Sequence, residues 1–173
     1  LNLSSKVNDY VKFNSRFIIG QDTGFTSLGA KKDNNNAGPT VDGDADANVQ
    51  LSNAYFGFTA IPNTVVNVGK QGLTTPYTVA VDINGNEQTG TGILALTTVG
   101  PVTGGLGYFN NTNLDLSNEI NATLGLSQVA PVALNGGSDI YVATVQGDLD
   151  FVKLEAWYLG MQDTFNSYTL AAN

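Results

Sequence analysis

The chain has 173 residues, of which 42% are hydrophobic and only 13% are charged, and its formal net charge is −8. This length allows one ordinary domain with a core, while the charged fraction is about half the usual globular value. Seven scattered cations argue against a nucleic-acid partner, because they cannot neutralise a run of phosphates. The absence of Cys and His removes thiolate chemistry and the commonest general base, so we expect no enzymatic activity.

The two ends of the chain resemble partial strands. The opening "LNLSSKVNDY" reads as the second half of a strand, and the closing "SYTLAAN" reads as the start of one. No stretch approaches the roughly 18 apolar residues that a transmembrane helix needs. No basic segment followed by an apolar one begins the chain, so we expect a signal peptide to be missing or already removed. We therefore expect residues 1–173 to be a single partial domain, truncated at both ends.

Alternation with a period of two dominates the chain and predicts strands throughout. Enrichment in Val, Ile, Thr, Tyr and Phe supports this interpretation. Several strands approach the roughly 10 residues that cross a membrane when tilted. The predicted strands are Leu1–Val7, Val11–Gly20, Val49–Ile61, Thr64–Gln71, Thr91–Val99, Thr103–Asn110, Asp139–Gly147 and Asp150–Gly160, with a further start near Ser167.

The connections alternate between short and long. Tight turns are expected at 8–10, 62–63, 100–102 and around Leu149, and long loops at Gln21–Asn48, Gly72–Gly90 and Asn111–Ser138. Compact soluble domains rarely hold several loops of about 20 residues, whereas outer-membrane barrels have short turns at one rim and long loops at the other. The pattern favours an all-β, antiparallel, up-and-down transmembrane β-barrel. Eight strands and a start would be about half of a porin barrel of roughly 16 to 18 strands.

The charges within the strands indicate which face looks inward. Lys12 and Arg16 alternate with apolar residues in one strand, and Lys153 and Glu155 do so in another. A Lys or Arg facing lipid at mid-bilayer costs roughly 2–4 kcal/mol, so these residues should face the lumen of a barrel. A soluble sandwich with one wet face fits the alternation equally well, and the long loops favour the barrel.

Two motifs carry little chemistry. The stretch Asp42–Asn48 begins like a calcium loop, but Ala47 replaces the required Gly and Asn53 replaces the final Glu, which excludes an EF-hand. A weak calcium contact and a solvated acidic loop remain as interpretations, and the second is favoured. The stretch Gly90–Ala95 matches a loose dinucleotide-binding pattern, but a strand follows it instead of a helix N-terminus.

Four cations, Lys12, Arg16, Lys70 and Lys153, are candidates for a basic patch on the wall of a pore. Acids of the loop Gly72–Gly90 would then face the patch across the lumen and set up a transverse field that selects ions. These acids are Asp82 and Glu87. The alternative is that all of these are scattered surface charges. For Lys70 the pattern leaves lumen and rim open, because Asn67 and Gln71 form the wet side of its strand.

The chain resembles the major outer-membrane porins of the Campylobacter type. The resemblance covers nearly the whole chain, as the first half of such a barrel. It rests on "LNLSSKVNDYVKFNSRFIIG" before a long loop and on "VQLSNAYFGFTAIPNTVVNVGKQ", with the strand end "GKQ". The hairpins "TGTGILALTTVGPVTGGLGYFNN" and "SDIYVATVQGDLDFVKLEAWYLG" follow the order of the family.

The resemblance implies a trimeric general-diffusion porin of about 18 strands that prefers cations. In that family the loop after the "GKQ" strand folds inward and narrows the pore, which here would bring Asp82 and Glu87 towards the lumen. Calcium is the implied ligand of Asp82, and no other cofactor is expected. The expected partners are small hydrophilic solutes, ions, outer-membrane lipid and two further copies of the chain.

The prediction is therefore a cation-preferring porin of the outer membrane of a Gram-negative bacterium. The alternative is a soluble extracellular β-sandwich, as in an adhesin or a surface-layer module. A glycosidase would need two placed carboxylates, and no motif identifies them. The candidate pore-lining or constriction residues are Lys12, Arg16, Asn67, Lys70, Gln71, Asp82, Glu87, Lys153 and Glu155.

Overall fold

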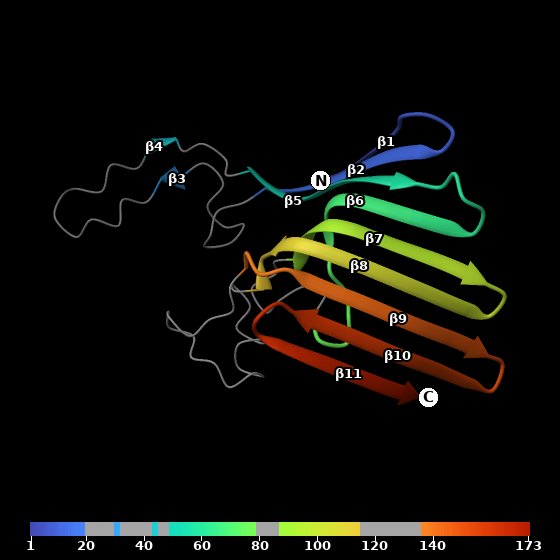
Figure 1. The fold of residues 1–173 in the computed structure, drawn as a ribbon. Helices are drawn as coiled ribbons and strands as arrows, with labels where there is room; N and C mark the ends of the chain where they lie inside the picture. The colour runs from blue at the N-terminus through green and yellow to red at the C-terminus, as the bar shows by residue number, and fades with distance from the viewer. Residues whose placement is uncertain (20–29, 32–42, 45–48, 79–86, 115–135) are drawn as a thin grey trace.

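The computed structural model describes residues 1–19, 30–31, 43–44, 49–78, 87–114 and 136–173. In the described part of the chain, nine antiparallel strands form one open sheet, and each pairs with the next of these nine in chain order (Figure 1). The prediction of an all-β, up-and-down antiparallel chain is thereby confirmed. The strands are β1 Asn2–Lys6, β2 Val11–Ile19, β5 Val49–Phe58, β6 Thr64–Gly72, β7 Thr89–Val99, β8 Val102–Thr112, β9 Ile140–Leu149, β10 Val152–Met161 and β11 Phe165–Ala172.

The predicted strands are all present, and their ends differ by a few residues. The largest change is in Val49–Ile61, where β5 ends at Phe58, ahead of a turn in which Asn63 has a φ of 56°. Asn tolerates this left-handed conformation better than most residues, so it suits the turn. Two short strands, β3 Ala30–Lys31 and β4 Gly43–Asp44, pair with each other inside the predicted loop Gln21–Asn48.

Short and long connections between strands lie at opposite ends of the sheet. The turns before β2, β6, β8 and β10 are short and lie at one end of the sheet, here called the turn end (Figure 1). The long connections that follow β2, β6 and β8 leave from the opposite, loop end. The connection between β10 and β11 departs from this alternation, because it is a short turn at the loop end in which Asp163 has a φ of 56°.

One face of the sheet, here called the apolar face, carries mostly exposed hydrophobic side chains. Side chains alternate between faces along a strand, so the strand register assigns each one to a face. Leu106 is 68% exposed and Leu170 is 85% exposed on this face. A single register-connected row crosses it through Val11, Phe58, Val66, Ala95, Leu106, Ala143 and Tyr158.

The opposite face, here called the polar face, carries the charges. Six of the seven charged residues in the nine main strands project from it, and Lys70 is the exception. The two-face assignments predicted for Lys12 and Arg16, and for Lys153 and Glu155, are confirmed by the register. The six residues are Lys6, Lys12, Arg16, Asp148, Lys153 and Glu155.

The strands are staggered with respect to the turns. The row that begins at Val11, the first residue of β2, reaches β10 at Tyr158, which lies six residues beyond Val152 at the start of that strand. The row makes six strand-to-strand steps on the way, so the stagger is about one residue per strand. With a rise of about 3.3 Å per residue and a spacing of about 4.8 Å, the strands tilt by about 35° from the normal to the line of turns.

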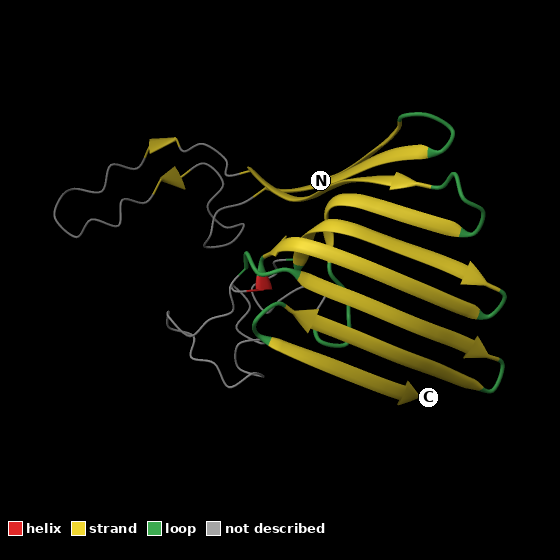
Figure 2. Ribbon diagram, viewed as in Figure 1, coloured by secondary structure: helices red, strands yellow, loops and turns green. Residues whose placement is uncertain are grey.

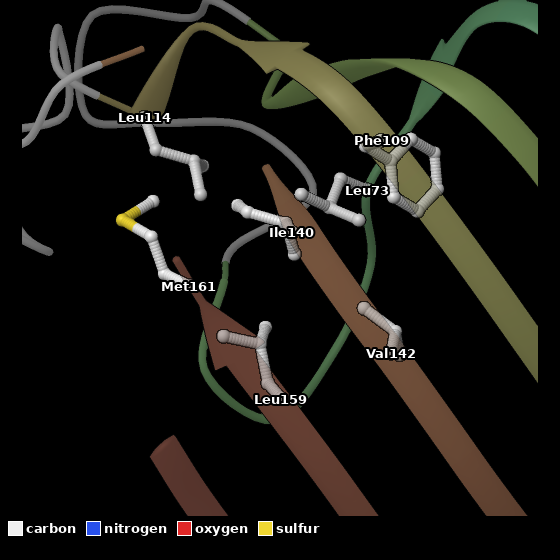
Figure 3. Close-up of a cluster of buried hydrophobic side chains, with 7 residues drawn as sticks. All are labelled: Leu73, Phe109, Leu114, Ile140, Val142, Leu159 and Met161. Atoms are coloured by element: carbon white, nitrogen blue, oxygen red, sulfur yellow. The ribbon is translucent and has the colours of Figure 1, made fainter. Parts of the chain in front are cut away.

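A small hydrophobic core lies on the polar face at the loop end. Phe109, Ile140 and Leu159 are fully buried, and they come from the three neighbouring strands β8, β9 and β10 (Figure 3). Leu73, from the chain after β6, packs into the same group. The complete cluster is Leu73, Phe109, Leu114, Ile140, Val142, Leu159 and Met161.

Candidate functional site

The segment Leu73–Thr78, which follows β6, lies against the polar face. Leu73 is 3% exposed and points into the cluster beside Ile140 and Phe109 (Figure 3). Its backbone N–H donates to the carbonyl oxygen of Gln88 at 2.9 Å, so both ends of the connection from β6 to β7 stay paired. Figure 2 shows this segment as a loop beside the ends of β9 and β10. The chain after the "GKQ" strand therefore packs on the sheet instead of extending from it.

The local sequence explains why the segment turns. Thr75, Pro76, Tyr77 and Thr78 form a β-turn, closed by a bond from the Thr78 N–H to the Thr75 carbonyl at 3.2 Å. Pro at the second position presets the φ that the turn requires. The Thr75 N–H donates to the Thr78 hydroxyl at 2.8 Å, and that hydroxyl donates to the Leu73 carbonyl at 2.5 Å. Threonine side chains thus satisfy the backbone of a buried turn.

Glu87, at the other end of the connection, reaches back across the sheet to β5 and β2. Its carboxylate accepts hydrogen bonds from Arg16 Nη1 at 3.0 Å, from Ser52 Oγ at 2.6 Å and from Asn53 Nδ2 at 3.1 Å. The Arg16 side chain is 36% exposed and that of Glu87 is 16% exposed. This is the most buried of the ion pairs in the described part of the chain.

A β-bulge brings two of these donors together. Arg16 pairs with Asn53 and Phe17 pairs with Leu51, which leaves Ser52 as an extra residue in β5. A bulge places two residues opposite one and redirects a side chain that regular alternation would send to the other face. Ser52 and Asn53 can therefore both bind the Glu87 carboxylate.

The backbone around Glu87 is also fixed. Asn113 Nδ2 donates to the Glu87 carbonyl at 2.9 Å, and the Thr89 N–H donates to Asn113 Oδ1 at 2.8 Å. Gly72 leaves room for the carboxylate, because a Cβ at that position would lie 3.1 Å from Glu87 Oε1. Side chain and backbone together hold Glu87 in one position over the polar face.

The predicted charge arrangement needs correction at this pair. Glu87 was expected to face the basic patch across an open lumen, whereas it contacts Arg16 directly. The two charges therefore neutralise each other on one side of the sheet, because opposite charges at contact distance cancel most of their field. Asp82 lies outside the described residues, and within the described ranges no group of three or more metal-ligating side chains occurs.

The other predicted residues of β2 and β6 lie on the polar face as expected. Asn67 pairs with Gly57, which pairs with Lys12, so all three project to the same side. Gln71 is 3% exposed, and its Nε2 donates to the Asn67 carbonyl at 3.4 Å. Lys12 is exposed and makes no ion pair with any residue in the described ranges.

Lys153 and Glu155 lie on the polar face at the turn end of β10, far along the sheet from Arg16. Lys153 forms an exposed ion pair with Asp148 at 3.3 Å. Glu155 accepts a hydrogen bond from Trp157 Nε1 at 3.0 Å. The structure therefore places the described candidate residues other than Lys70 at two separate sites on the polar face.

Lys70 does not share this face. It pairs with Ala54 and Thr91 and projects from the apolar side, near the loop end of β6. Its Nζ donates to the carbonyl oxygen of Leu51 at 3.1 Å. The prediction that Lys70 shares a face with Lys12, Arg16 and Lys153 is contradicted by the register, and its placement at a lumen or at a rim stays a prediction.

Ser52 and Asn113 are site residues that the sequence did not indicate. Each bonds Glu87 from a distant part of the chain, and neither forms a recognisable motif with it. Comparisons with protein-family models, with curated proteins and with solved structures found no match. In the described ranges, no helix has the length and apolar character needed to cross a bilayer.

Proposed function

We propose that this chain forms part of the wall of a general-diffusion porin in the outer membrane of a Gram-negative bacterium. The observation that carries the proposal is the division of the sheet into an exposed apolar face and a polar face with nearly all strand charges. A soluble protein buries its apolar face and exposes its charged one. Here the segment Leu73–Thr78 covers part of the charged face, and the apolar face carries the exposed side chains.

The energetics favour lipid against the apolar face. Val145 is 56% exposed and Leu154 is 45% exposed, and exposure of a large apolar side chain to water costs up to about 1.5–3 kcal/mol. Leu106 and Leu170 are more exposed still. Lipid removes this cost, and the polar face then borders the water of a lumen.

The dimensions of the sheet also support a membrane wall. A strand of 10 residues, such as β9 or β10, is about 33 Å long and spans about 27 Å when tilted by about 35°. This matches the apolar band of about 25 Å and the tilt of about 35–45° found in outer-membrane barrels.

Four tyrosines on the apolar face lie where the strands approach the loop end. Tyr108 and Tyr141 have ring centroids 5.3 Å apart, and Tyr158 and Tyr168 have theirs 5.2 Å apart. The hydroxyl of Tyr108 donates to Asp139 at 3.0 Å, and that of Tyr158 donates to Asn166 at 3.0 Å. Tyrosine with an apolar ring and a polar tip suits the membrane–water interface, so this group supports an aromatic girdle.

The polar face would provide the wall of the pore, and the segment Leu73–Thr78 would narrow it. Small hydrophilic solutes and ions would then pass by diffusion, and width and wall charge would set the selectivity. We further propose a preference for cations, with calcium as a ligand of Asp82 and with assembly as a homotrimer. The described strand residues of the polar face include four cations and two acids, so this preference would depend on acids outside the described ranges, such as Asp82.

Conductance of the complete protein in planar lipid bilayers tests the proposal. We expect discrete steps and a reversal potential biased towards cations in a salt gradient. The substitution Asp82→Asn should reduce that bias. A protein that remains a monodisperse monomer in buffer without detergent would contradict the porin and support the soluble extracellular β-sandwich.

A further inference from the structure

We propose that Glu87 is a positioning residue that holds the segment Leu73–Thr78 against the polar face, and that it does not act as a charge of the ion filter. The inference rests on the proposed function only in its consequence for the pore. The positioning role itself depends only on how the two ends of the connection from β6 to β7 are fixed to different strands.

Backbone hydrogen bonds join the two ends of the connection between β6 and β7. Gly72 pairs with Thr89, and the Leu73 N–H donates to the Gln88 carbonyl at 2.9 Å, so Leu73 and Glu87 flank the same short ladder. Leu73 is inserted into the cluster on β8–β10, while the Glu87 side chain bonds β2 and β5. A shift of Glu87 would therefore move the ladder on which the Leu73–Thr78 segment begins.

The contacts of Glu87 are those of an anchoring group. Both carboxylate oxygens lie within hydrogen-bond distance of Asn53 Nδ2, at 3.3 and 3.1 Å, and one oxygen also binds Arg16 and Ser52. Charge-assisted bonds of this kind, shielded from water, are stronger than neutral ones. A filter charge, by contrast, needs contact with passing ions, and the Glu87 side chain is only 16% exposed.

Opposite substitutions separate the two roles. Glu87→Gln removes a negative charge, and Arg16→Gln removes a positive one. An ion filter would respond to them in opposite directions. A positioning contact would respond in the same direction, because either change breaks the ion pair and releases the segment.

Residues 1–173 contain no cysteine, so a single introduced thiol in this part of the protein can be followed directly. Thr75→Cys places one thiol in the segment, at a position that is 8% exposed. This change also removes the hydroxyl that accepts a hydrogen bond from the Tyr77 N–H at 3.2 Å, so every labelling rate is compared with that of T75C alone. The complete protein carrying T75C is reacted in detergent micelles with a water-soluble maleimide. The same reaction is run with Glu87→Gln, with Arg16→Gln and with the control Asp148→Asn, which breaks the exposed pair with Lys153 on the same face.

We expect Glu87→Gln and Arg16→Gln each to raise the labelling rate roughly ten- to a hundredfold, the range for loss of a charge-assisted hydrogen bond. Asp148→Asn should leave the rate unchanged, and the exchange of charges, Arg16→Glu with Glu87→Arg, should restore slow labelling at least in part. Far-UV circular dichroism checks that the sheet persists, and Arg16→Gln carries the test if Glu87→Gln does not fold.

Labelling rates equal to that of the Asp148→Asn control would overturn the positioning role. This outcome is independent of the proposed function, because labelling requires no channel. Channel steps without a labelling contrast would leave the porin intact and remove Glu87 as a positioning residue. A labelling contrast without channel steps would contradict the porin and leave the positioning role standing.

Discussion

The three residues Gly69, Lys70 and Gln71 serve three different purposes at the end of one strand. Gly69 has a φ of 130°, and a Cβ there would lie 2.5 Å from the carbonyl oxygen of Ala54, so only glycine fits this approach to β5. Lys70 projects from the apolar face and bonds a backbone carbonyl. Gln71 is buried on the polar face. One cation at a strand end is therefore no sign of a pore charge.

The opposed positions of Lys12 and Lys70 give a matched pair of substitutions. Lys12→Gln should raise the cation preference, because a unit charge about 7 Å from a passing ion in water contributes about 0.6 kcal/mol, which is roughly a two- to threefold change in permeability ratio. Lys70→Gln should leave this ratio unchanged. Reversal potentials in a salt gradient measure both, and an equal shift in the two variants would contradict the assignment of faces.

At the scale of elements, sequence alternation predicted the strands and the facing of the two strands with charges. Val152, Leu154, Ala156 and Tyr158 all fall on one face as expected, because one residue of slip would have inverted every one of them. The predicted strand ends were less accurate, because the hydrogen-bond ladder of a sheet can continue past polar residues. In β8 it continues to Thr112.

The contacts around Glu87 could not be predicted from the sequence. Arg16 and Glu87 are 71 positions apart, and their contact depends on the order of four strands and on a bulge of one residue at Ser52. Nothing local in the sequence signals that bulge. The expectation that the loop after β6 folds inward came from the resemblance, and the described part of that loop does pack on the polar face.

Substitutions at two adjacent residues of β9 test which face of the sheet contacts lipid. Val145→Lys places a charge on the apolar face, and we expect it to destabilise the protein in lipid vesicles by about 2–4 kcal/mol. Gln146→Lys places the same charge on the polar face and should change stability by less than about 0.5 kcal/mol. Denaturant unfolding followed by the fluorescence of Trp157 measures the difference, and equal effects would contradict a lipid-facing surface.

At the scale of the whole molecule, the sheet combines three properties that suit a membrane wall. Its apolar face is exposed, its strands are staggered by about one residue per strand, and its charges gather on the other face with a packed segment. The composition already indicated an exposed apolar surface. Only 13% of residues are charged, which is too few to cover the surface of a soluble domain. Which face carries the strand charges could be predicted from the sequence alternation alone, but the closeness of Arg16 and Glu87 required the structure.

If lipid covers one face of the sheet and water the other, a spin-label scan along β10 will distinguish the two faces residue by residue. Single cysteines at 153, 154, 155 and 156 are labelled in the complete protein in vesicles, and their accessibility to oxygen and to a water-soluble nickel relaxant is compared. We predict that labels replacing Leu154 and Ala156 favour oxygen, while those replacing Lys153 and Glu155 favour the nickel relaxant. Equal access of the nickel relaxant to all four positions would contradict the account.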